Sequence, residues 1–131
     1  MLKIYNGTPH KINIYKKEDT EYKPEIRKYI VKDGAKPIIT IDSNGLLNAK
    51  IEYTEKEVKD NITIYKMNAT GVDTVPENYD IVIVSNLFAT VAKDFNIEGV
   101  DKLYTVANPV YDNSENPRPV GCLGLLKVRD N

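Results

Sequence analysis

A short turn near the start of the chain carries the set of side chains best suited to chemistry. Asn6, Thr8 and His10 alternate with Gly7 and Pro9, and glycine and proline both favour a turn. The exposed amide, hydroxyl and imidazole could bind a phosphate or a ribose, and His10 could act as a general acid or base near neutral pH. The alternative is structural: the His10 ring bonds a backbone carbonyl and Thr8 is a turn hydroxyl. Because no partner acid or base is evident for His10, the turn taken alone favours the structural alternative.

Two further polar residues in the second half of the chain could contribute to an anion site. Ser85 directly precedes a predicted helix, whose first amides carry a partial positive charge. The flanking sequence has no glycine-rich loop, so a simple helix cap is the favoured role of Ser85. Arg118 is one of only three arginines and lies in a proline-rich loop, where a guanidinium could make a bidentate contact with phosphate.

The composition excludes several other chemistries. Cys122 is the only cysteine and His10 the only histidine, so neither a disulfide within the chain nor a cysteine-based zinc site is possible. The acidic residues follow no metal-binding spacing, and we expect neither a metal nor a cofactor. Cys122 lies within an apolar segment, where a buried small side chain is favoured over a catalytic thiolate.

Length and charge predict one domain over residues 1–131. The net charge is −1, which disfavours binding to extended nucleic acid. The longest apolar run, residues 81–84, is too short to span a membrane. The N-terminus lacks the apolar core of a signal peptide, so we expect a cytoplasmic protein.

The hydrophobic pattern predicts an α+β fold. Alternating or β-branched segments predict strands, and residues 2–5 and 11–15 could form an N-terminal hairpin. The middle third resembles an antiparallel meander in which residues 55–61 form a charged hairpin loop. Residues 25–31 fit a strand or one helical turn. We therefore expect a mixed, mainly antiparallel sheet of about six to eight strands.

The hydrophobic pattern of residues 79–128 predicts a buried strand, a helix and two further strands. Residues 79–85 form a continuous apolar strand, typical of burial on both faces. The apolar residues of 86–95 fall on one helical stripe, which predicts the single amphipathic helix. A strand at 103–106, a polar loop at 108–119 and an apolar strand at 120–128 complete the chain. The segment 79–106 could form a strand–helix–strand crossover.

Two passages resemble a family of small standalone proteins from phages, prophages and actinobacterial genomes. The opening NGTPHKINI is similar to the family's N-x-T-P-H-x-(I/V) motif, and YDIVIVSNLFATVAKDF with the later VGCLGL is similar to its ending. No activity follows from the family. The positions carried over by the motifs are Asn6, Thr8, His10, Ser85, Gly121, Cys122 and Gly124, of which the glycines are expected to serve backbone geometry.

The resemblance implies a setting in which small proteins often act on host defence. Our first hypothesis is a non-enzymatic homo-oligomer that binds a nucleotide-like ligand through Asn6, Thr8, His10, Ser85 and Arg118, sequestering a bacterial immune signal in the host cytoplasm. One alternative is a metal-independent phosphodiester hydrolase that uses His10. The other is a structural or protein-binding accessory in which the opening turn only shapes the fold.

Overall fold

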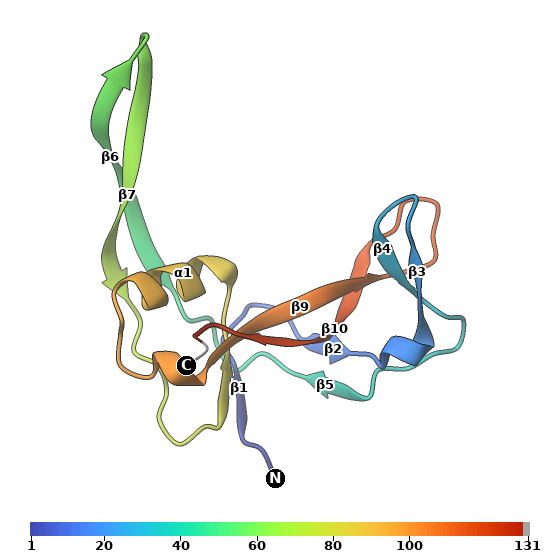
Figure 1. The fold of residues 1–131 in the computed structure, drawn as a ribbon. Helices are drawn as coiled ribbons and strands as arrows, with labels where there is room; N and C mark the ends of the chain where they lie inside the picture. The colour runs from blue at the N-terminus through green and yellow to red at the C-terminus, as the bar shows by residue number, and fades with distance from the viewer. Residues whose placement is uncertain (130–131) are drawn as a thin grey trace.

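The computed structural model describes residues 1–129 (Figure 1). It contains ten strands, one α-helix and two 3-10 turns. The strands are β1 (Ile4–Asn6), β2 (Ile12–Ile14), β3 (Thr20–Lys23), β4 (Lys28–Val31), β5 (Ile39–Ile41), β6 (Ala49–Lys59), β7 (Ile62–Val72), β8 (Ile81–Ile83), β9 (Leu103–Tyr111) and β10 (Pro119–Lys127). The helix α1 spans Asn86–Asp94, and the 3-10 turns are η1 (Lys17–Asp19) and η2 (Val100–Lys102).

Eight of the strands form one mixed sheet. Its main path runs β1-β8-β9-β10-β2-β5, and β4 pairs with β9 and with β3 beside that path. The pairs β1–β8, β8–β9, β10–β2 and β4–β9 are parallel, whereas β9–β10, β2–β5 and β3–β4 are antiparallel. The α+β class and the mixed sheet are therefore confirmed, with four parallel and three antiparallel pairs in the sheet.

The N-terminal hairpin expected from the sequence does not form. β1 pairs in parallel with β8, and β2 pairs with β10 and β5 instead of with β1. Turn residues between two short apolar segments fit a hairpin locally. Both segments instead pair with strands far away in the sequence, so the tertiary context overrides the local signal.

The core lies where β8 and α1 meet. Val82 and Ile83 of β8 are fully buried between β1 and β9, as the continuous apolar run predicts. The parallel pairing of β8 and β9 with α1 between them confirms the crossover. α1 buries Phe88 and Val91.

The apolar stripe of α1 is narrower than the sequence indicates. Leu87 lies at its edge and Phe95 is the C-cap residue just beyond the helix; they are 43% and 59% exposed. The helix has only nine residues, and its buried face consists of Phe88, Ala89, Val91 and Ala92, so the side chains beside and beyond that face stay in solvent.

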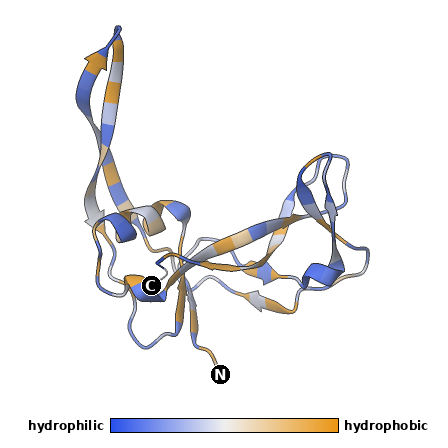
Figure 2. Cartoon of the chain, in the orientation of Figure 1, coloured by the Kyte–Doolittle hydropathy of each residue, from blue (hydrophilic) through white to orange (hydrophobic). Residues whose placement is uncertain are grey.

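The hairpin β6–β7 extends away from the rest of the molecule as a two-stranded arm (Figure 1). Each strand has eleven residues, and the turn at Asp60 and Asn61 has positive φ at both positions, typical of a two-residue hairpin loop. The predicted loop at 55–61 is therefore wrong for its first part, because residues 55–59 continue β6. Apolar and polar residues alternate along the arm (Figure 2).

Candidate functional site

The opening turn is built around the Asn6 side chain, which is fully buried. The Asn6 Nδ2 donates to the carbonyl oxygens of His10 and Ile41 at 2.9 and 3.1 Å. Its Oδ1 accepts from the Thr8 amide at 3.0 Å and from the Thr8 hydroxyl at 2.7 Å. These bonds occupy the donors and acceptors of the Asn6 amide within the protein. Asn6 and Thr8 thus shape the turn that carries His10.

His10 and the C-terminal third meet at one cavity. The cavity has a volume of about 410 Å³, within the range of small-ligand sites. One wall is the segment from His10 to Asn13, and the other consists of β9 and β10. The residues of that second wall are Val106, Pro109, Tyr111, Pro119, Val120, Gly121 and Cys122. Of the predicted site residues, His10 lines this cavity, whereas Asn6, Thr8, Ser85 and Arg118 do not.

Asn13 bonds the two walls of the cavity to each other, and Gly121 allows their close approach. The Asn13 Nδ2 donates to the Val120 carbonyl at 3.1 Å, and its Oδ1 accepts from the Thr40 hydroxyl at 2.7 Å. A Cβ atom added at Gly121 would lie 2.4 Å from the Asn13 carbonyl oxygen. The expected structural role of the motif glycines is therefore confirmed for Gly121. An added Cβ at Gly124 would meet no atom within 4 Å, so close packing does not require that glycine.

The lining of the cavity favours an anion with an apolar part. Lys11 and His10 line it, and no carboxylate does so among the residues that the structure describes. The Cys122 side chain is 1% exposed, and burial raises the pKa of its thiol. Cys122 is therefore a protonated, buried side chain at neutral pH, in agreement with the structural role expected for it.

A second hollow adjoins the first and shares Pro109 and Tyr111 with it. Its volume is about 510 Å³, and Tyr22, Tyr29, Arg27 and Asn108 complete its lining. The Tyr22 and Tyr29 rings lie 4.9 Å apart between centroids. Aromatic faces beside a guanidinium suit a nucleobase and a phosphate.

Sequence reasoning missed Arg27 as a site residue. The argument from the small number of arginines held for Arg27 as much as for Arg118. The tyrosines beside Arg27, however, are brought there by the tertiary structure. Tyr22 and Tyr29 pair across β3 and β4, and Tyr111 joins them because β4 pairs with β9. No local spacing in the sequence indicates this cluster.

Arg118 lies in the loop between β9 and β10 and is exposed. Its amide donates to Asp112 Oδ1 at 3.1 Å, and the Ser114 hydroxyl donates to the same oxygen at 2.6 Å. The Ser114 and Arg118 hydrogen bonds hold the pKa of the Asp112 carboxyl below its ordinary value. The Arg118 main chain thus orders the loop outside the cavity.

Ser85 acts as the N-cap of α1. Its Oγ accepts from the Phe88 amide at 3.2 Å, the role that the sequence favoured for it.

We expect Ser85→Ala to lower the free energy of unfolding by about 1 kcal/mol, because the cap hydrogen bond is lost. Urea denaturation would measure this change. Ser85→Asp should keep most of the stability, since a carboxylate caps equally well and favours the helix N-terminus. Equal losses for both variants would contradict the capping role.

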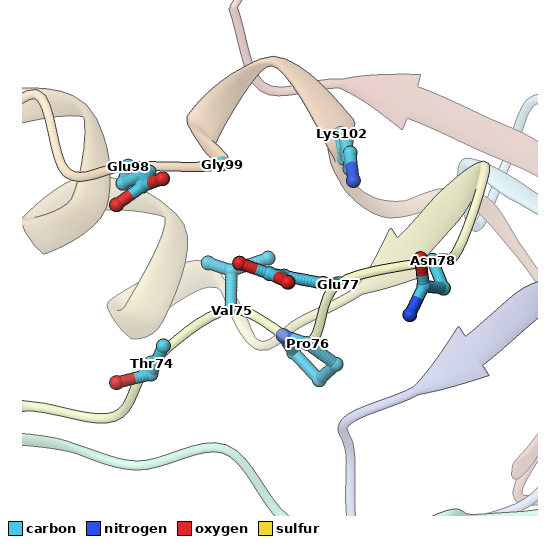
Figure 3. Close-up of a pocket in the computed structure, with 8 residues that line it drawn as sticks. All are labelled: Thr74, Val75, Pro76, Glu77, Asn78, Glu98, Gly99 and Lys102. Atoms are coloured by element: carbon cyan, nitrogen blue, oxygen red, sulfur yellow. The ribbon is translucent and has the colours of Figure 1, made fainter.

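A third cavity lies between residues 74–78 and the segment that leads into η2 (Figure 3). Its volume is about 400 Å³, and Glu77, Glu98 and Lys102 are its charged lining residues. Val75 packs against Gly99, where an added Cβ would lie 2.9 Å from the Val75 Cβ. This cavity lies between the β7–β8 connection and the α1–η2 connection, and none of the predicted site residues lines it.

Within residues 1–129, no three His, Cys, Asp or Glu side chains are grouped so as to hold a metal ion. In the same range, no helix has both the length and the apolar character needed to cross a bilayer. Comparison with family models, curated proteins and solved structures finds no match to this chain.

Proposed function

We propose that this protein is a non-enzymatic binder of a nucleotide-like anion, held in the cavity between His10 and β10. The observation that carries the proposal is the composition of the lining: Lys11 and His10 line an otherwise largely apolar cavity, and its described lining residues include no carboxylate. The phosphate binds Lys11 and His10 through charge-assisted hydrogen bonds. The base packs against Val106, Pro109 and Tyr111.

The adjoining hollow extends the site toward a larger ligand. Arg27 and the tyrosines there suit a second base and phosphate, so a dinucleotide fits the proposal better than a mononucleotide. The resemblance to phage and prophage proteins supports sequestration of a bacterial immune signal in the host cytoplasm as the biological role.

The His10-dependent hydrolase remains a second hypothesis with less support. His10 is exposed, and the residues with which it shares the cavity include no carboxylate to orient its ring. Chromatography of the ligand recovered after incubation and denaturation of the protein separates the two functions. A binder returns the intact ligand, whereas a hydrolase returns product.

The test measures thermal shifts with a panel of cyclic dinucleotides and cyclic ADP-ribose isomers, followed by calorimetry on the best ligand. Lys11→Ala should weaken binding by about tenfold or more, because a hydrogen bond to a charged group contributes about 1.5–3 kcal/mol. His10→Ala should act in the same direction. Both residues are exposed, so the melting temperature without ligand should stay nearly unchanged.

Lys127→Ala is the matched control, because Lys127 is exposed at the far end of β10 and outside the cavity lining. It should bind as the wild type does. A panel that produces no thermal shift would overturn the proposal, as would equal affinity for the Lys11→Ala and Lys127→Ala variants.

A further inference from the structure

The two edges of the β6–β7 arm differ sharply in charge. Six of the eleven residues in β6 are charged, whereas Lys66 is the only charged residue in β7. Charged side chains and bulges protect a free strand edge against pairing with another chain. The β6 edge has this protection and the β7 edge lacks most of it.

Each strand of the arm carries one bulge, and the bulge on β7 lies near its base. The register shifts between Glu55 and Glu57, so Lys56 is the extra residue on β6. Near the base of the arm, Lys50 faces Gly71 and the next pair joins Ile51 to Ala69, which leaves Thr70 as the extra residue on β7. Residues 62–69 of β7 are therefore a regular strand, and its outer edge pairs with no other strand of the described chain.

One face of the arm carries exposed apolar side chains. The cross-strand pairs Tyr53–Met67 and Glu55–Tyr65 place Tyr53, Tyr65 and Met67 on this face, with Glu55 as a charged side chain beside Tyr65. These three side chains are 67%, 56% and 36% exposed. A two-stranded ribbon is at best marginally stable by itself in water. A strand paired to the free β7 edge would satisfy its unpaired backbone groups and widen the ribbon into a more stable sheet.

We propose that β7 pairs with β7 of a second copy of this chain, antiparallel and about a two-fold axis, to form a four-stranded sheet. Two-fold pairing of an identical edge is self-complementary and closes after two chains. A two-fold axis perpendicular to the sheet makes the two β7 strands antiparallel and keeps the apolar faces of both arms on the same side. The allowed registers are then those in which directly opposed residues come from the same face of each arm.

Charge disfavours one of the allowed registers, and an aromatic pair favours another. A two-fold centred on Tyr65 places Met67 opposite Thr63 and Lys66 opposite Ile64 of the second copy. Centring it one residue further, on Lys66, would set two lysines directly opposite each other, which is destabilising. The Tyr65 register adds an aromatic cross-strand pair at the axis, a favourable contact.

Sedimentation velocity across a wide concentration range tests the proposal on the full chain. The wild type should sediment at twice the monomer mass of 14.8 kDa. Tyr65→Lys should raise the dissociation constant by about tenfold or more, because it puts like charges opposite each other at the axis. Tyr53→Lys is the matched control: it makes the same change on the same face, but on the strand whose outer edge stays free, so the dimer should persist.

A cysteine cross-link covers the case in which Tyr65→Lys fails to fold. Tyr65→Cys brings two thiols together at the axis and should form a covalent dimer under mild oxidation, whereas Tyr53→Cys should not. The native Cys122 is buried and should not interfere. A wild type that is monomeric at every concentration would overturn the proposal. Equal dissociation by the two lysine variants, or equal or no cross-linking by the two cysteine variants, would also overturn it.

Discussion

Replacing Asn6 by alanine should lower the free energy of unfolding by about 3–5 kcal/mol. The Asn6 amide makes four hydrogen bonds in a fully buried position. Alanine would leave the Ile41 carbonyl and the Thr8 amide without these partners, and each buried unsatisfied group costs about 1–3 kcal/mol. The turn that carries His10 would loosen, so ligand binding should fall as well.

Urea denaturation measures the loss, with Asn116→Ala as the control at an exposed loop position. The control should change stability by less than about 0.5 kcal/mol. If Asn6→Ala abolished ligand binding while stability stayed at the wild-type level, Asn6 would be a ligand contact rather than the structural centre of the turn.

Gly121→Ala is the second change with a large expected effect. The new methyl group would lie 2.4 Å from the Asn13 carbonyl oxygen and 2.7 Å from the Tyr15 ring. The carbonyl belongs to the backbone of β2, so β2 and β10 would have to separate. We expect a loss of about 3 kcal/mol or more, together with a widened cavity and weaker ligand binding.

Gly124→Ala provides a matched control on the same strand, because an added Cβ there meets open space. Alanine at this position should leave the free energy of unfolding unchanged or raise it slightly, since it reduces the freedom of the unfolded chain. Similar urea midpoints for the two variants would show that the close approach of β2 and β10 does not limit stability.

The elements with a complete local signal were predictable from the sequence. The run at 81–84 and the apolar stripe that follows it predicted β8 and α1, and the structure confirms both. Ser85 was predictable as a cap because capping depends on residues within one turn of the chain. Gly121 and Gly124 were expected to serve backbone geometry, but only the contact with Asn13 explains why Gly121 must be a glycine.

Strand partners were not predictable, because pairing is a long-range choice. The segments at 2–5 and 11–15 fit a hairpin locally, yet β1 pairs with β8 and β2 pairs with β10. The charges at 55–59 indicated a loop, but a strand with solvent on both sides can carry charges without burying them. The arm therefore became visible only in the structure.

By itself, the sequence determined the class of the fold, the buried strand and its helix, and the lack of cysteine or histidine pairs for a metal. The tertiary structure alone decided that His10 and Gly121 line one cavity, that Arg27 and three tyrosines line the adjoining hollow, and that β7 leaves an edge open. The physical reason is that periodicity and capping act between neighbours in the chain, whereas a binding cavity requires segments about a hundred residues apart to bury each other's surfaces.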